Sequence, residues 1–97
     1  MTSFDLTIIT PEGKIFKGPV ESVSVPGVQG SFGVLNRHAP IASKLTKGVV
    51  RILQEGAEIF YSIAPGIFEV NHKSEALLLT DKATKASSLA EAKQLLN

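Results

Sequence analysis

Apolar and polar residues alternate along this chain up to about residue 80. Phe4, Leu6 and Ile8 are separated by Asp5 and Thr7, which is the period-two pattern of a strand with one buried face. The same parity predicts further core-facing residues: Val23, Val25, Val50, Ile52, Ile59, Tyr61, Ile63, Phe68, Val70, Leu77 and Leu79. Because β-branched and aromatic residues dominate these positions, the pattern predicts a series of short strands.

Short turn motifs interrupt these runs. Thr10–Gly13 has proline second and glycine fourth, which is typical of a type I turn. Glu55–Gly56 and Asn71–Ser74 are typical of hairpin connections. Pro26–Gly27 and Pro65–Gly66 favour type II turns, in which the glycine takes a positive φ. Many short strands separated by Gly and Pro predict an all-β fold, a two-sheet antiparallel β-sandwich.

The pattern changes after Leu79. Ser87 or Ser88 can cap a helix, and Glu91 lies three residues after Ser88, which is typical of a capping box. Apolar residues then recur at helical spacing: Leu89, Ala92 and Leu96. We therefore expect a β-sandwich domain over residues 1–82 and a short C-terminal α-helix in a tail over residues 83–97.

Composition excludes several function classes. Ten Lys and Arg against nine Asp and Glu leave a net charge of +1, too weak a field to indicate a nucleic-acid partner. Charged residues make up 20% of the chain, below the usual value of about 25%, and the mean hydropathy is +0.17. The absence of Cys excludes disulfides, thiolate metal sites and cysteine nucleophiles. We interpret the apolar excess as surface that a partner covers.

Apolar residues also occupy strand positions that the alternation assigns to the outer face: Ile9, Leu53, Phe60, Ile67 and Leu78. One interpretation is ordinary, since soluble domains expose scattered apolar atoms and a β-bulge shifts the parity. The other is a contiguous partner-binding face, which the low charge fraction favours.

No motif indicates chemistry. His38 and His72 are the only histidines, and no carboxylates are placed to complete a metal site with both. The glycines of Pro26–Gly33 lack the spacing of a phosphate-binding loop, and no Gly-x-Ser-x-Gly turn is present. The longest apolar run, Ala76–Leu79, is far shorter than a membrane span. We expect no catalytic residue, no metal, no cofactor and no direct membrane insertion.

The run Thr80–Ala83 resembles the lysine-containing segment of lipoyl and biotinyl carrier domains, which would place a cofactor on Lys82. In carrier domains, however, that lysine divides the sheet near its middle, whereas Lys82 is expected to follow the last strand. A carrier domain is therefore the main alternative, and a generic β-sandwich binding module is the next.

Four segments together resemble the N-terminal domain of the epsilon subunit of F-type ATP synthases, called delta in mitochondria. These segments are residues 10–18 (TPEGKIFKG), 30–41 (GSFGVLNRHAPI), 48–52 (GVVRI) and 66–70 (GIFEV). The second segment is specific, the others are weaker individually, and the match covers nearly the whole chain in the right order.

The resemblance implies a β-sandwich bound to the gamma subunit at the foot of the rotating central stalk, with one end against the polar loops of the membrane c-ring. Such a subunit couples proton translocation to ATP synthesis without catalysing any step. It is a peripheral membrane protein on the cytoplasmic side of a bacterial inner membrane, or of an equivalent energy-transducing membrane. The alpha and beta catalytic subunits are further candidate partners of the C-terminal tail.

Two sets of contact residues are expected. The family match, together with the position of turns at a sandwich end, predicts the c-ring contact: Ser31, Phe32, Asn36, Arg37, His38 and Ala39. The outer-face parity predicts the contact with gamma, together with the helical tail: Ile9, Leu53, Phe60 and Leu78.

Some family members bind ATP through a Leu/Ile-Asp-x-x-Arg-Ala motif in C-terminal helices that also restrain ATP hydrolysis. The corresponding run here, Leu89–Gln94, lacks both the Asp and the Arg. We therefore expect no ATP binding and weakened regulation of ATP hydrolysis.

Overall fold

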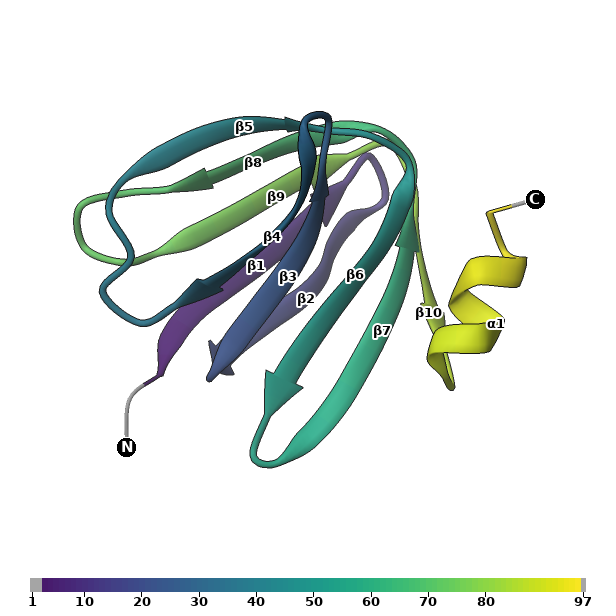
Figure 1. The fold of residues 1–97 in the computed structure, drawn as a ribbon, viewed down its shortest axis with the longest axis horizontal. Helices are drawn as coiled ribbons and strands as arrows, with labels where there is room; N and C mark the ends of the chain where they lie inside the picture. The colour runs from purple at the N-terminus through teal and green to yellow at the C-terminus, as the bar shows by residue number, and fades with distance from the viewer. Residues whose placement is uncertain (1–2, 97) are drawn as a thin grey trace.

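The computed structural model describes residues 3–96, which form ten strands and one short helix (Figure 1). The strands are β1 (Phe4–Thr10), β2 (Gly13–Val20), β3 (Ser22–Gly27), β4 (Gly30–Leu35), β5 (Ile41–Leu45), β6 (Gly48–Gln54), β7 (Ala57–Ile63), β8 (Gly66–Val70), β9 (Ala76–Thr80) and β10 (Ala83–Ala86), and the helix is α1 (Leu89–Gln94). The prediction of an all-β fold followed by a short helix is confirmed.

The strands form two layers joined at one corner. The first layer contains β2, β1, β9, β8 and β5, and the second contains β10, β7, β6, β3 and β4. A single pairing, Gly27 with Leu45, connects β3 to β5 and makes the hydrogen-bonded sheet continuous. Among the described strands every pair is antiparallel except β1 and β9, which are parallel. No hairpin links β1 to β9, so nothing local imposes the antiparallel direction that we predicted throughout.

The core lies between the two layers. Its largest fully buried side chains come from both of them: Phe68, Leu6, Ile8, Ile52, Leu78, Val20, Val23, Val25, Val34 and Val50. Two edge-to-face aromatic pairs connect the layers, Phe16 with Tyr61 at 6.4 Å between ring centroids and Phe32 with Phe68 at 6.1 Å. Because a core of interlocking buried side chains transmits strain, the sandwich forms a stiff body.

The predicted parity of β9 is wrong. Leu78 is 0% exposed, whereas Leu79 is 38% exposed and Leu77 is half-buried. The parallel pairing aligns Leu78 with Ile8 of β1, so the two side chains share the core-facing side. Four consecutive apolar residues offer no polar contrast from which this parity could be read.

Two Pro–Gly pairs do not form the predicted type II turns. Pro26 and Gly27 lie within β3, and the β3–β4 turn is at Val28 and Gln29. Gly66 begins β8 without a positive φ; a Cβ there would lie 2.1 Å from the carbonyl oxygen of Leu79. The glycine is therefore required by the close approach of β9.

The β6–β7 connection follows the prediction. Glu55 and Gly56 join the two strands, and both have positive φ values, of 51° and 78°. Two central residues with positive φ are typical of the tight turns that match the twist of a β-hairpin.

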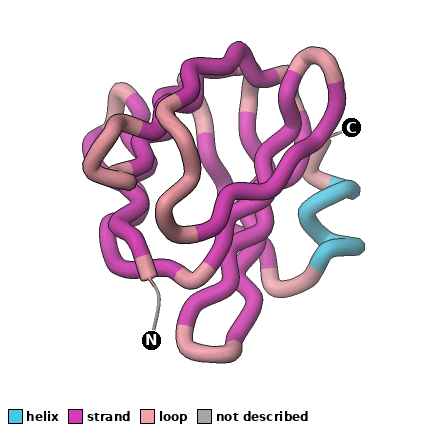
Figure 2. Tube along the Cα trace, turned by 60° about the vertical axis from the view of Figure 1, so that its left-hand side comes forward, coloured by secondary structure: helices cyan, strands magenta, loops and turns pink. Residues whose placement is uncertain are grey.

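The C-terminal segment differs from the predicted helical tail. Residues 83–86 form strand β10, which pairs with β7, so the strands continue past the predicted boundary at residue 82. The helix α1 lies on the outside of the second layer (Figure 2). Ser88 is its N-cap, with its Oγ accepting from the Glu91 N–H at 3.1 Å, as the capping pattern predicted. The Glu91 carboxylate accepts from the N–H of Ser87 instead of Ser88.

Within residues 3–96, no helix combines the length and the hydropathy needed to cross a membrane.

Candidate functional site

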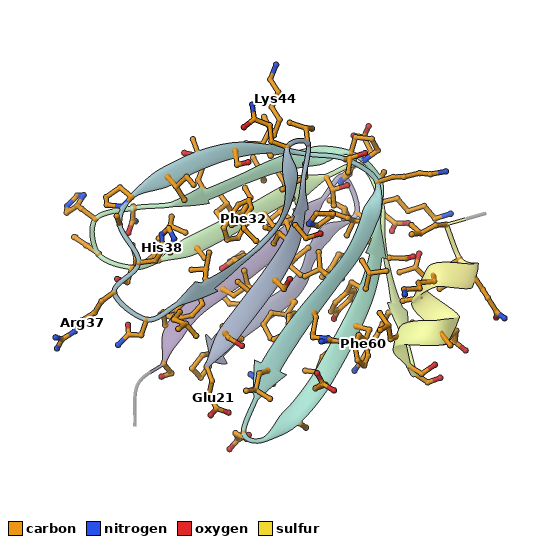
Figure 3. All side chains as sticks on the ribbon, viewed as in Figure 1. Glu21, Phe32, Arg37, His38, Lys44 and Phe60 are labelled. Carbon is orange, nitrogen blue, oxygen red and sulfur yellow. The ribbon has the colours of Figure 1, made fainter. Side chains whose placement is uncertain are left out.

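The turn between β4 and β5 contains four of the predicted c-ring residues, and three of them, Arg37, His38 and Ala39, form its tip. Arg37 is exposed and has a left-handed φ of 64°, which reverses the chain direction. The N–H of His38 donates to the carbonyl oxygen of Leu35 at 3.2 Å and closes the turn. Ala39 is exposed, and the Arg37 side chain extends away from the fold (Figure 3). These residues form a projecting tip at one end of the sandwich.

The ring of His38 is held within this tip. Its Nδ1 lies 2.6 Å from the carbonyl oxygen of Ala39. Because a carbonyl oxygen only accepts, Nδ1 carries the proton. In the neutral ring Nε2 is then an acceptor, so the tip combines the guanidinium of Arg37 with an imidazole of defined tautomer.

The remaining predicted c-ring residues are Asn36, which begins the same turn, and Ser31 and Phe32 of β4. Asn36 is half-buried and lines a shallow pocket with Ser3–Asp5 and Lys73–Glu75, at the same end as the tip. Ser31 lies near the other end of β4, four residues from Leu35, or about 13 Å along the strand. Phe32 is partly buried and packs against the core. The six residues therefore extend from the start of β4 to the turn that follows it. Only part of the Phe32 ring is accessible to a partner.

A row of apolar side chains crosses the outer face of the first layer. Ile67 of β8 lies opposite Leu79 of β9, and Leu79 lies opposite Ile9 of β1. Ile67 is 47% exposed, Leu79 is 38% exposed and Ile9 is half-buried. Leu77 lies two residues before Leu79 on the same face and is half-buried. We call these four residues the apolar row.

Lysines flank the apolar row at both ends. Lys44 of β5 pairs with Ile67, and Lys14 of β2 pairs with Ile9 across a β-bulge. A shallow pocket of about 310 Å³ lies beside the row, lined by the β1–β2 turn, the start of β8 and the end of β9. An apolar centre with a charged rim is the usual composition of a protein–protein contact.

The structure does not bring the four predicted gamma-contact residues together. Ile9 belongs to the apolar row, whereas Leu78 is in the core and unavailable to a partner. Leu53 is half-buried on the second layer. Phe60 is also on that layer, 8% exposed, covered by α1 and by the guanidinium of Arg51, 5.5 Å from its ring centroid.

The predicted gamma-contact residues did not include Ile67, Leu77 and Leu79, which lie on one surface with Ile9. The sequence did indicate that Ile67 lies on the outer face, because it occupies an outer position in the apolar–polar alternation. Leu77 and Leu79 were assigned to the core by the ambiguous run in β9. The row depends on pairings between β8, β9 and β1, and β1 is distant from the other two in sequence.

Lys82 does not have the position of a carrier lysine. It is exposed in the connection between β9 and β10, and those strands are not paired with each other. Lys82 is therefore not at the tip of a hairpin. The expectation that Lys82 follows the last strand is wrong, because β10 comes after it. No group of three or more His, Asp or Glu side chains within residues 3–96 is arranged to hold a metal.

The model of the ATP synthase delta/epsilon chain β-sandwich domain matches residues 3–86. The chain belongs to this family. Its membership agrees with the two-layered fold and with the resemblance found in the sequence.

Similar proteins are named ATP synthase epsilon chain. The protein from Chlorobaculum tepidum is 41% identical over 83 residues, which cover 84% of this chain and 93% of the relative. The protein from Chromohalobacter salexigens is 39% identical over 93 residues, or 95% of this chain. The protein from Rhodopseudomonas palustris strain BisA53 is 35% identical over 89 residues, or 92% of this chain. The match spans 65% of the length of each of the latter two relatives.

Two solved structures share the fold of this family member. A chain in the Euglena gracilis mitochondrial ATP synthase, in a structure of OSCP, F1 and the c-ring, aligns with a TM-score of 0.82 at 26% identity. That alignment covers 86% of this chain and 53% of the other. A chain from the central stalk and c-ring of the Tetrahymena thermophila enzyme aligns with a TM-score of 0.75 at 11% identity, covering 95% of this chain and 85% of the other, and shows the fold alone.

Proposed function

We propose that this chain is a non-catalytic subunit of the central stalk of an F-type ATP synthase. In this role it links the gamma subunit to the membrane c-ring and transmits rotation, so that proton translocation is coupled to ATP synthesis. It works as a peripheral subunit on the cytoplasmic side of a bacterial inner membrane, or of an equivalent membrane. Its family and the names of its relatives support the proposal.

The apolar row is the observation that carries the proposal, as the contact with gamma. Fully burying an Ile or Leu side chain contributes roughly 1.5–3 kcal/mol. Ile67 and Leu79 retain 47% and 38% exposure, so covering them contributes about 1 kcal/mol each. Leu53 and Phe60 of the original gamma set lie on the other layer and are not part of this contact.

The c-ring contact uses the end of the sandwich that carries the β4–β5 turn. Arg37 and His38 provide the polar groups, and Ala39 and Asn36 flank them. Ser31 and the exposed edge of Phe32 extend the contact along β4. This surface differs in chemistry from the apolar row, so one chain can bind two different partners.

A subunit that transmits torque must be stiff, and it needs no catalytic group. The two interlayer aromatic pairs and the continuous core resist shear between the layers. A load applied at the apolar row therefore reaches the β4–β5 turn through packed side chains.

Regulation through α1 is expected to be weak. Its residues, Leu89–Gln94, lack the Asp and the Arg of the family's ATP motif. Calorimetry with ATP should show no binding below millimolar concentration, and sub-millimolar binding would contradict this expectation. Contacts of the tail with the alpha and beta subunits remain part of the proposal.

Titration of the purified chain with gamma tests the proposed function. Leu79→Lys places a charge in the centre of the apolar row and should weaken binding at least about tenfold. Ala57→Lys is the matched control, because Ala57 is exposed at the start of β7 in the second layer, away from the row, and the variant introduces the same charge. Equal affinity of gamma for both variants, or no binding by the unmodified chain, would contradict the proposal.

The c-ring contact has its own test. Arg37→Glu and His38→Ala should assemble with the ring at lower yield, and the Arg37→Glu complex should dissociate at lower salt, because a charge contact is screened by ions. Assembly of both variants at the unmodified yield and salt resistance would refute this contact.

A further inference from the structure

A groove separates β4 from β5 although a short turn connects them. At the β3–β4 hairpin β5 pairs with β3, Gly27 with Leu45, and from there β4 and β5 diverge toward the β4–β5 turn (Figure 1). The groove holds about 520 Å³ and is lined by Gly27–Phe32 and Ile41–Lys44. Within the described residues β4 pairs only with β3, so its other edge faces this groove.

The outward edge of β4 carries free backbone groups. Pro26 lies opposite Ser31 and has no N–H, so the two cannot form a hydrogen-bonded pair. The Pro26 carbonyl instead accepts from the N–H of Thr46 at 2.9 Å, away from β4. Ser31, which lines the groove, therefore points its N–H and C=O away from β3, and alternation gives Gly33, just beyond the lining residues, the same direction.

The hydrogen bond that closes the β4–β5 turn agrees with this direction. Leu35, two residues beyond Gly33, accepts from His38 through its carbonyl oxygen on the same side. No hydrogen bond within residues 3–96 reaches the outward groups of Ser31 or Gly33. Unpaired edge groups of this kind are a template for another strand.

The opposite rim has matching groups. The carbonyl oxygen of Lys44 accepts from the N–H of Val28 at 3.0 Å, which shows that Lys44 points its backbone groups away from β8. Alternation gives Ala42 the same direction, toward the groove. Both rims therefore offer backbone donors and acceptors.

The floor of the groove is apolar. Phe32 and Ile41 are partly buried and pack against the core below it. The Phe32 ring lies edge-to-face with Phe68 of the other layer, and Figure 3 shows the Lys44 side chain extending outward at the rim. Lys44 is the only charged residue in the lining. An apolar floor between backbone rims suits an extended peptide whose alternate side chains point down.

We propose that an extended segment of the gamma subunit pairs with β4 in this groove and adds a strand to the second layer. The inference rests on the proposed function, because it identifies the occupant with the partner of the apolar row. Lys44 supports this identification: it forms the rim of the groove and is also paired with Ile67, the first residue of the row. A protein covering the row is thus directly beside the groove.

The chemistry of the segment follows from the groove. The gamma segment pairs its backbone with Ser31 and Gly33. Its apolar side chains contact Phe32 and Ile41, and one of its carboxylates contacts Lys44. Strand pairing uses backbone groups and leaves side chains free on the faces of the sheet. The side chain of Ser31 therefore remains available for the c-ring contact. The ring of Phe32 is covered by gamma in this arrangement, so the c-ring contact then consists of the other five residues.

Amide hydrogen exchange in the complex with gamma is the test. The Ser31 and Gly33 amides should exchange at least about tenfold more slowly in the complex than in the free chain, since both gain partners. The amides of Phe32 and Val34, which point toward β3, are internal controls and should change little.

The outcomes separate the two proposals. If gamma binds and shields the apolar row while Ser31 and Gly33 exchange as in the free chain, strand addition is refuted and the proposed function stands. If no complex forms, the proposed function fails and the inference fails with it.

A pair of variants gives a second test. Gly33→Pro removes the outward N–H, which an edge strand tolerates, and should weaken gamma binding about tenfold. Gly33→Ala keeps that N–H, and its Cβ would lie 3.9 Å from the nearest atom, the carbonyl oxygen of Val23. Equal binding by the two folded variants would overturn the proposal; if Gly33→Pro does not fold, hydrogen exchange on the unmodified chain decides.

Discussion

Ile67 and Leu79 lie directly opposite each other on β8 and β9, and both side chains face solvent. The two residues flanking Leu79, Leu78 and Thr80, are buried. Strand β9 therefore places one apolar residue in the core and the next in the solvent-facing apolar row. Stability and binding should respond to different residues of the same strand.

Substitutions in β9 test this separation. Leu78→Ala should lower the free energy of unfolding by about 2–5 kcal/mol, because it opens a cavity in the core. Leu79→Ser should change it by roughly 0.5 kcal/mol, as is usual at a half-exposed position. Chemical denaturation measures both, and a larger loss for Leu79→Ser would mean that the parity is reversed.

The bond between Ser62 and α1 gives a second prediction. The Oγ of Ser62 donates to the carbonyl oxygen of Ala92 at 2.6 Å, in the last turn of the helix, where such carbonyls lack helical partners. Ser62→Ala should weaken docking of α1 by about 1 kcal/mol. Faster hydrogen exchange in α1 with unchanged exchange in β3 and β8 is the expected result, and uniform acceleration across the chain would contradict it.

The β6–β7 turn contains a strained residue. Glu55 has a φ of 51°, which asparagine adopts more easily than glutamate. Glu55→Asn should stabilise the fold by about 0.5–1 kcal/mol and raise Tm by roughly 2–8 °C. Glu58→Asn, in the following strand, is the control and should give no increase. A lower Tm for Glu55→Asn would show that Glu55 has another role in the turn.

Alkaline pH should destabilise the fold through Tyr61. Burial raises the pKa of its phenol above the ordinary value of 10.0. The folded chain then holds this proton more tightly than the unfolded chain, so the contribution is complete below pH 10 and is lost as the pH rises through the folded pKa. Between about pH 9 and pH 11 the free energy of unfolding of the unmodified chain should therefore fall more than that of Tyr61→Phe, which has no phenol to ionise. The same difference between the two chains at both pH values would contradict the assignment.

The alternating segments could be predicted from the sequence because their inner and outer residues differ in polarity. In Phe4–Ile8 this contrast is strong, and the predicted core residues are buried. Ala76–Leu79 has no such contrast, and pairing with β1 sets its parity. The helix cap was predictable because Ser88 and Glu91 act within one turn.

The apolar row, which we propose as the partner surface, could be predicted only in part. Ile9 and Ile67 are on the expected face, but their association requires β1 to lie beside β9, a parallel pairing between distant segments. Phe60 was expected outside, and α1 covers it because Ala92 packs on its ring. Local periodicity contains no information about either long-range contact.

The position of gamma on the chain is the most direct test of the proposed function. Cross-saturation from gamma to the methyl groups of the bound chain, read by NMR, reports which side chains gamma touches. We expect transfer to Ile67, Leu79 and Ile9, with Leu53 on the opposite layer unaffected. Transfer to Leu53 without transfer to Ile67 or Leu79 would contradict the assignment of the apolar row as the contact with gamma.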